Sequence, residues 1–243
     1  DFSTVVASPD SELKLRVKEK VFSVFEPKLK ALLHEYKPII GTYLCKGKNS
    51  NYMVDLHQDW SFVDENQGYV SVNMWCPLVE TNSSNGVLSA LPKSNLLPRY
   101  PRVSPSSHCF DRAILKGYEK FVVQIPTKLG EAIFFDNGLF HSSGPNLTNQ
   151  DRLVAGLLSI PKELEGILYY NNGPQCVDEY LVDEHFFINQ NPFTDKSEKY
   201  VRTISGVNER VVYEKMIDLY GEPDLIEHKP MAKPFWKRWF HLS

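Results

Sequence analysis

Apolar residues recur at helical spacing near the start of the chain. They form one stripe along residues 9–36, made up of Leu13, Val17, Val21, Val24, Phe25, Leu29, Leu32, Leu33 and Tyr36. Ser8 is a suitable N-cap, and Pro9 fits the first turn, where a helix needs no N–H donor. The pattern predicts a helix over 9–36 that packs on a sheet, with Pro27 as the point where it kinks or divides.

From residue 39 the pattern changes to short apolar runs with turn residues between them. Breaks such as Lys46-Gly47-Lys48-Asn49 and Gly144-Pro145-Asn146 have the composition of turns. Many short strands with this punctuation predict an antiparallel sandwich or barrel. The expected strands are 39–45, 52–56, 69–78, 86–91, 121–125, 131–135, 153–160 and 167–170.

The rest of the chain carries weaker signals. Residues 96–118 are rich in Pro and Ser and predict a long surface loop, on which Arg99 and Arg102 are expected to be solvated. Residues 207–220 have helical periodicity. We expect a single domain over 1–243, in which 9–36 is a helical support, 39–170 is the β core and 171–243 is a helical and loop cover.

Composition narrows the class of protein. The 243 residues are 42% hydrophobic and 23% charged, close to the globular average, so the chain can bury a substantial core. The net charge of −3, without a dense Lys/Arg face, argues against a nucleic-acid partner. No apolar run is long enough to span a membrane.

The four cysteines have no metal-binding or disulfide spacing. Cys45, Cys76, Cys109 and Cys176 form no CxxC pair, so we expect free thiols in a reducing compartment and a cytoplasmic location. The chain begins Asp1-Phe2-Ser3, without an initiator Met or the apolar segment of a signal peptide. Whether a targeting segment precedes it is left open.

Candidate metal ligands stand at the end of one expected strand. His57-Gln58-Asp59 follows the run 52–56, and residues i and i+2 of an extended segment point to the same side. An imidazole and a carboxylate suit a divalent transition metal. A third ligand from a distant strand would complete the two-His-one-carboxylate set, which leaves metal positions open for other molecules.

His141 is the candidate for that third ligand. It follows the expected strand 131–135 and a turn that contains Gly138. Arg152 comes soon afterwards, at the start of the next apolar strand, where a guanidinium can bind a carboxylate through two hydrogen bonds. Each residue alone is a weak signal, and the order of the set favours a metal site over isolated polar residues.

With these residues in place, the sequence resembles the phytanoyl-CoA dioxygenase family of iron(II)- and 2-oxoglutarate-dependent oxygenases. The matching stretches are His57-Gln58-Asp59, Trp75 to Leu91-Pro92, Gly130-Glu131-Ala132-Ile133-Phe134-Phe135, and His141-Ser142-Ser143-Gly144-Pro145-Asn146 with Arg152. The resemblance covers about residues 39–160. It implies a mainly β fold with flanking helices, a cupin-like double-stranded β-helix or jelly roll.

The resemblance also implies roles for the site residues. His57, Asp59 and His141 would hold iron(II), while Arg152 would bind the distal carboxylate of 2-oxoglutarate with help from Ser143. Trp75 and Asn73 would lie near this co-substrate, and O2 would be the second one. The expected reaction is hydroxylation of an unactivated C–H bond of a small organic metabolite, because the carboxylate of Asp59 fills the position that halogenases leave open.

Two other functions are compatible with the same residues. A cupin-like metalloenzyme without 2-oxoglutarate would share the metal ligands but would not need Arg152. A non-catalytic jelly-roll binding module would need neither. The chain also departs from the family where Lys93-Ser94-Asn95 replaces a common Gly-Ser-His, at the rim expected to select the substrate. Substrate identity, other oxidative outcomes such as desaturation, and oligomeric state are left open.

Overall fold

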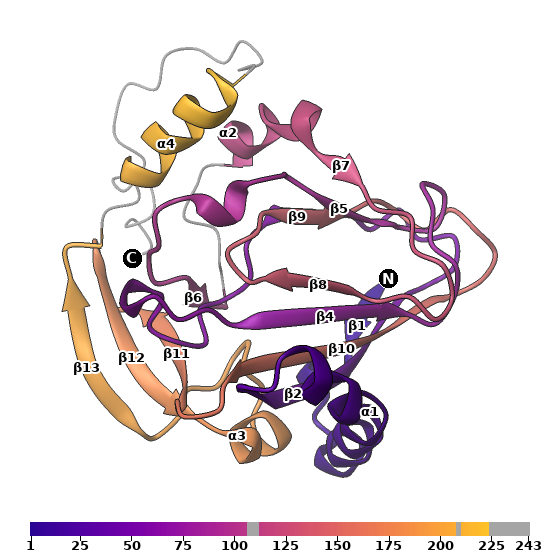
Figure 1. Cartoon of the computed structure of the whole chain (residues 1–243), viewed down its shortest axis with the longest axis horizontal. Helices are drawn as coiled ribbons and strands as arrows, with labels where there is room; N and C mark the ends of the chain where they lie inside the picture. Colours follow the sequence, from indigo (N-terminus) through magenta and orange to yellow (C-terminus); the bar gives the residue numbers. More distant parts are fainter. Residues whose placement is uncertain (106–111, 208–209, 224–243) are drawn as a thin grey trace, which may run out of the picture.

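The molecule is built around two antiparallel sheets that face each other (Figure 1). The computed structural model describes residues 1–105, 112–207 and 210–223. The larger sheet has the order β1 (Phe2–Thr4), β2 (Tyr36–Lys46), β10 (Arg152–Pro161), β4 (Val72–Pro77) and β8 (Ile133–Asp136). The smaller one has the order β3 (Val54–His57), β9 (His141–Ser143), β5 (Leu88–Ala90) and β7 (Val123–Gln124). Each of the eight expected strands overlaps one of these or β11.

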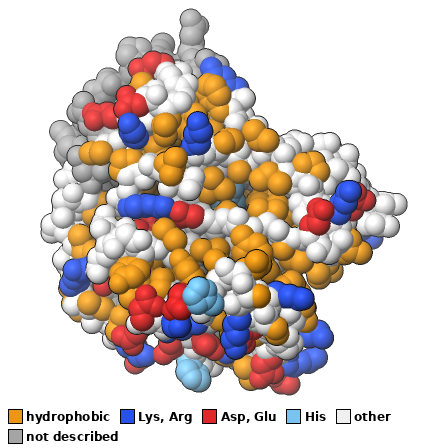
Figure 2. Space-filling view, viewed as in Figure 1, with side chains coloured by type: hydrophobic (Ala, Val, Ile, Leu, Met, Phe, Trp, Pro, Cys, Tyr) orange, Lys and Arg blue, Asp and Glu red, His pale blue; other side chains and the backbone are white. Residues whose placement is uncertain are grey.

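The space between the two sheets is filled by apolar side chains from both of them. Trp75, Phe135 and Val154 of the larger sheet pack with Leu88 of the smaller one. The two sheets form the antiparallel sandwich that the sequence pattern predicted, and their strand order is that of the double-stranded β-helix, or jelly roll, that the resemblance implied. Hydrophobic side chains gather across the middle of the face in Figure 2, and charged ones gather over α1 and α3.

A third sheet lies beside the jelly roll. Its order is β13 (Tyr200–Ser205), β12 (Cys176–Val182), β11 (Gly166–Asn171) and β6 (Val103–Ser104), with β6 parallel to β11 and the other pairs antiparallel. Residues 171–243 were expected to be helices and loops, so β12 and β13 correct that expectation. The reason is non-local: β12 pairs along the whole of β11, which offers it an otherwise open edge.

Helix α1 (Ser11–Leu32) covers the outer face of the larger sheet (Figure 1). Its buried residues Val17, Val21 and Leu29 pack on Ala155 and Leu157 of β10. The helix is shorter than the predicted 9–36 and runs through Pro27 without ending there. Its cap is Asp10 rather than Ser8, because the Asp10 carboxylate accepts a hydrogen bond from the Leu13 N–H at 2.9 Å.

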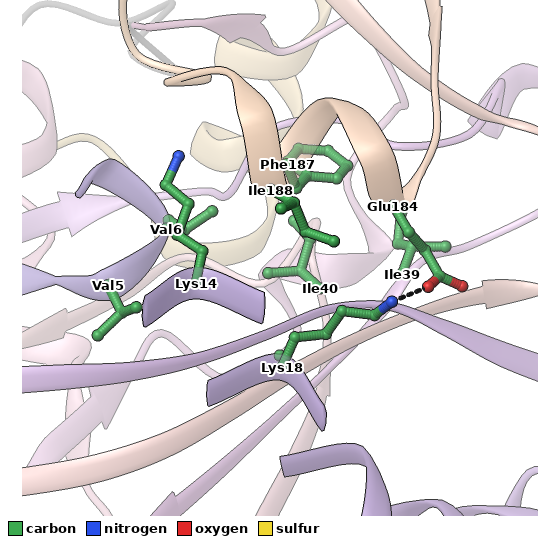
Figure 3. Close-up of a pocket in the computed structure, with 10 residues that line it drawn as sticks. Val5, Val6, Lys14, Lys18, Ile39, Ile40, Glu184, Phe187 and Ile188 are labelled. Carbon is green, nitrogen blue, oxygen red and sulfur yellow. Dashed lines mark ion pairs between the residues drawn. The ribbon is translucent and has the colours of Figure 1, made fainter. Parts of the chain in front are cut away.

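A second, short helix, α3 (Glu184–Asn189), locks α1 in place (Figure 3). Lys18 of α1 forms an ion pair with Glu184. Lys14 is only 5% exposed, and its ammonium group donates a hydrogen bond to the Gln190 carbonyl at 2.7 Å. Burial lowers the pKa of Lys14, and this carbonyl supplies the polar partner that a buried ammonium group needs.

Helix α4 (Arg210–Tyr220) covers the other side of the smaller sheet (Figure 1). Its Val212 and Met216 pack in one cluster with Leu91, Tyr100 and Tyr118. The stretch 96–118 was expected to be a loop, but within its described part it contains β6 and α2 (Arg112–Lys116). Short 3-10 helices occupy Val5–Ala7, Glu65–Gln67, Ser94–Leu96 and Glu119–Phe121. Among the described residues, none of the helices has the length and apolar content needed to cross a membrane.

The packing of α1 gives a stability prediction. Leu29 is 2% exposed, whereas Leu32, three residues later on the same helix, is 65% exposed. Leu29→Ala removes buried methyl groups and leaves a cavity, so we expect the free energy of unfolding to fall by about 2–5 kcal/mol. Leu32→Ala, the matched control, should change it by less than about 0.5 kcal/mol. Urea unfolding measures both, and equal effects would show that α1 does not dock on the sheet through Leu29.

Candidate metal centre

Two histidines face each other across the smaller sheet. β3 pairs with β9 so that His57, the last residue of β3, lies directly opposite His141, the first residue of β9. Their ring centroids are 4.3 Å apart. In each case Nδ1 lies against a backbone carbonyl two residues earlier, Asp55 at 2.8 Å and Leu139 at 3.0 Å. Donation from Nδ1 to these carbonyls makes Nε2 the metal-binding nitrogen of both rings.

Asp59 lies between the two Nε2 atoms. Its Oδ1 is 3.7 Å from Nε2 of His57 and its Oδ2 is 3.8 Å from Nε2 of His141. One ligand atom of each residue lies within 4.8 Å of the others, so the structure brings together the three ligands that the sequence proposed. Two imidazoles and one carboxylate on one side of an ion suit iron(II), and they leave its remaining positions open.

Neighbouring groups hold Asp59 in this orientation. Asn73 of β4 donates a hydrogen bond from Nδ2 to Oδ2 of Asp59 at 2.6 Å. Arg102 Nε donates to the Asp59 backbone carbonyl at 2.5 Å, and the Asp59 N–H donates to Asn137 at 3.2 Å. Asn73 was expected beside the co-substrate, and in the structure it contacts the carboxylate ligand. Because Asn73 occupies Oδ2, Oδ1 is the better placed oxygen for a metal ion.

The pKa values of Asp59 and His141 also suit a metal site. Burial raises the pKa of Asp59, but His141 and His57 outweigh this effect and lower it to about 2. Burial and the neighbouring His57 lower the pKa of His141 to about 4. Burial lowers the pKa of His57, but its contact with the Asp59 carboxylate more than offsets this, so the net change is upward. At neutral pH, Asp59 is therefore charged and His141 is neutral, as metal ligation requires.

Arg102 and Arg99, expected to be solvated, are both ion-paired. Arg102 is 1% exposed and donates two hydrogen bonds to Glu65, at 2.7 and 2.6 Å. Arg99 forms a similar two-bond contact with Asp136, at 3.0 and 2.5 Å. The expectation was wrong because the segment lies against Glu65 and Asp136, and a buried guanidinium needs such a carboxylate partner. Because Arg102 also donates a hydrogen bond to the Asp59 carbonyl, this ion-pair network helps to fix the backbone of the carboxylate ligand.

Arg152 is different, because it is a buried cation with no carboxylate partner among residues 1–105, 112–207 and 210–223. It is the first residue of β10 and is 2% exposed. Its guanidinium carbon lies 5.5 Å from the centre of the Trp75 ring, and within the described ranges its Nε has no hydrogen-bond partner. Burial lowers the pKa of Arg152 to about 10. A carboxylate of a bound molecule would supply the missing partner.

Lys46 is a second buried cation, and sequence reasoning missed it. It is the last residue of β2, lies directly opposite Arg152, and is fully buried. Its ammonium group donates hydrogen bonds to the carbonyl and hydroxyl oxygens of Ser143, both at 3.0 Å, and to the carbonyl of Gly144. The sequence treated Lys46 as a turn residue. The available signal was its two-residue spacing from Leu44, which points inward.

Comparison with known proteins gives the family. The sequence model of the phytanoyl-CoA dioxygenase (PhyH) family matches residues 4–154, more than half of the chain. The chain belongs to this family. The matched range includes His57, Asp59, His141 and Arg152. None of the curated proteins that were compared matches the chain.

Solved structures resemble the PhyH chain in fold. The epimerase SnoN in complex with Fe3+, alpha ketoglutarate and nogalamycin RO is 17% identical, with a TM-score of 0.54, and the match covers 86% of this chain and 75% of SnoN. The carbocyclase SnoK from nogalamycin biosynthesis is 17% identical, with a TM-score of 0.51 and coverage of 83% and 75%. EvdO2 from Micromonospora carbonacea var. aurantiaca, complexed with 2-oxoglutarate, is 19% identical, with a TM-score of 0.50 and coverage of 66% of each chain.

These likenesses establish the fold, the jelly roll that the family resemblance implied. The chain spans less than two thirds of the length of the first solved structures that it matches, 32% of EvdMO1 and 64% of EvdO2 in the structure without 2-oxoglutarate.

The hydrogen bond from Asn73 to Asp59 gives a prediction about metal affinity. Asn73→Ala lets the carboxylate rotate, and loss of such a supporting contact typically weakens metal binding about 10- to 100-fold. Asn172→Ala is the matched control, because Asn172 makes the same kind of bond to Asp178, at 2.8 Å on the surface. Calorimetric titration with iron(II) under anaerobic conditions measures both. Unchanged affinity in Asn73→Ala would show that Asn73 does not orient the ligand.

Proposed function

We propose that this protein is a 2-oxoglutarate-dependent non-haem iron dioxygenase that hydroxylates an unactivated C–H bond of a small organic metabolite. The observation that carries the proposal is the combination of two sites on one jelly roll. His57, Asp59 and His141 converge at one point, and Arg152 is a buried guanidinium without a carboxylate partner in the described part of the chain. Membership of the PhyH family supports the same assignment.

Different residues of the chain would hold the metal and the co-substrate. His57, Asp59 and His141 would hold iron(II), and three protein ligands leave room for a chelating keto acid and oxygen. Arg152 would bind the distal carboxylate of 2-oxoglutarate through its two-pronged guanidinium, over the face of Trp75. Ser143 would assist at that end by holding Lys46, because its hydroxyl accepts a hydrogen bond from Lys46 at 3.0 Å while it donates to the Gly86 carbonyl at 2.9 Å.

When bound, iron(II) would supply the oxidative chemistry: 2-oxoglutarate would be converted into succinate and CO2, with one oxygen atom of O2 entering succinate and the other the hydroxyl group of the substrate. The chain's own part is to hold and orient the reactants and to limit water. Phe135 contributes an apolar wall, because its ring centroid lies 4.8 Å from that of His141. An apolar wall beside the centre fits a C–H bond as the reacting group.

Arg152 separates this proposal from its rivals. A cupin-like metalloenzyme without 2-oxoglutarate needs the metal ligands and gives no reason to bury an unpaired guanidinium at a cost in free energy. A non-catalytic binding module gives no reason for either site. Hydroxylation is proposed over halogenation because Asp59 supplies a carboxylate ligand at the centre.

Succinate formation tests the activity. We expect the iron-loaded protein to convert 2-oxoglutarate slowly on its own, and faster with its substrate in a metabolite-library screen. His141→Ala should abolish succinate formation and keep the melting temperature within a few degrees, because the site lies at the mouth of the sheets rather than in the α1 core. Iron-loaded wild-type protein that forms no succinate and binds no 2-oxoglutarate would contradict the proposal. Product analysis then separates hydroxylation from epimerisation or ring closure.

Arg152 provides a second, more selective test. Arg152→Ala leaves the bound carboxylate unpaired, and such a loss costs about 2–5 kcal/mol of binding free energy. Arg152→Lys keeps the positive charge but loses the planar group that donates two hydrogen bonds, so it should weaken 2-oxoglutarate binding less than Arg152→Ala does. Arg202→Ala, which removes a half-exposed arginine paired with Glu179, is the control. Anaerobic titration of the iron-loaded variants, followed by the metal-to-ligand absorption band, measures the affinity. Unchanged binding in Arg152→Ala would favour an enzyme without this co-substrate.

A further inference from the structure

Two positive charges lie side by side in the core of the jelly roll. Lys46 on β2 and Arg152 on β10 are opposite each other in the register of the larger sheet, so both side chains lie on the same face. Both residues are almost completely buried. Across the described residues, no Asp or Glu forms an ion pair with either one. The partners of the ammonium group are three neutral oxygens, from Ser143 and Gly144.

Neutral partners satisfy the hydrogen bonds of Lys46 but leave its charge uncompensated. Burying two like charges without an anion is costly, and the effect is visible in the lysine itself: burial and then the charge of Arg152 lower the pKa of Lys46 to about 8. Elsewhere in the same core the chain pairs its buried guanidinium, as Arg102 with Glu65 shows. The pair of Lys46 and Arg152 is therefore arranged for an anion from outside the chain.

The backbone around Lys46 is shaped for this side chain. Gly86 has a φ of +80°, and a Cβ there would lie 2.9 Å from the Gly144 carbonyl oxygen and 3.1 Å from Cδ of Lys46. Any other residue would collide with the Gly144 carbonyl, just after β9, and would crowd the lysine side chain. Ser143 links Lys46 to the metal centre, because it lies on the same short strand as His141, two residues later.

We infer that Lys46 and Arg152 together form one two-cation subsite for the distal carboxylate of the co-substrate. The inference rests on the proposed function for the identity of that molecule. Arg152 provides the two-pronged contact, and Lys46 provides a second charge next to it, held in place by Ser143 and Gly144. The subsite selects keto acids that end in a carboxylate, because an uncharged end would leave both cations buried and unpaired.

Two ligands that differ only at the distal end test this role. 2-Oxopentanoate has the same chain length as 2-oxoglutarate, but a methyl group stands in place of the distal carboxylate. The ratio of the two dissociation constants for iron-loaded protein under anaerobic conditions measures what the distal carboxylate contributes. A loss of structure around Lys46 would weaken the binding of both keto acids, whereas a loss of the charge alone would weaken the binding of 2-oxoglutarate only.

Lys46→Gln is the main variant, because its amide still donates hydrogen bonds toward Ser143 and Gly144 but carries no charge. We expect its affinity for 2-oxoglutarate to fall roughly 10- to 100-fold, with 2-oxopentanoate affected less than about threefold. Lys46→Arg keeps the charge, so the ratio of its dissociation constants for the two keto acids should stay close to that of the wild-type protein. Lys14→Met is the control, since Lys14 is a buried lysine bonded to a carbonyl on the opposite side of the larger sheet, and it should leave the ratio unchanged.

The outcomes separate this inference from the proposed function. If Lys46→Gln weakens both keto acids equally, or neither, Lys46 is not part of the carboxylate subsite, although the enzyme can still use 2-oxoglutarate. If wild-type protein binds neither keto acid, the proposed function fails. Thermal shifts with glutarate then test the subsite alone: stabilisation of wild-type but not Lys46→Gln protein supports it, and no stabilisation of either overturns it.

Discussion

The metal centre depends on the register between two short strands. β3 and β9 pair so that His57 faces His141, and Asp59 follows two residues after His57 on the same side. A slip of one residue would turn His141 to the other face of the sheet and separate the ligands. The register is held from both sides, by the apolar core between the sheets and by the bonds of Lys46 to Ser143 and Gly144. Packing and hydrogen bonds next to the centre therefore set the geometry of the ligands.

Charge pairing around the centre follows the same logic. Arg102 and Glu65 neutralise each other's charge in a buried ion pair. Arg102 also donates a hydrogen bond to the Asp59 carbonyl, so the same ion pair helps to fix a metal ligand. Arg152 and Lys46 break this rule within the described residues. A protein core tolerates such an exception where a bound molecule brings the opposite charge, at the expense of stability in its absence.

The sequence by itself determined the fold class and the candidate ligands. Short apolar runs and turn chemistry predicted eight strands that the structure contains, because these signals are local. They missed others, including β9, which carries His141. The spacing of His57 and Asp59 placed both on one side of a strand. His141 and Arg152 were candidates from their places next to later strands, and the PhyH resemblance implied the role of each residue. The helix periodicity predicted α1, although its cap shifted to Asp10 because Ser8 bonds to the backbone before the helix begins.

Tertiary structure alone decided which charges are paired and which strands form the third sheet. Arg99 and Arg102 looked like loop residues, and their partners Asp136 and Glu65 are more than 30 positions away in sequence. The position of Asn73 against Asp59 and of Lys46 beside Arg152 likewise depends on contacts between distant strands. Local sequence indicates that a segment is a strand but not which strand lies next to it. Burial and ion pairing depend on that neighbour, so only the tertiary structure shows them.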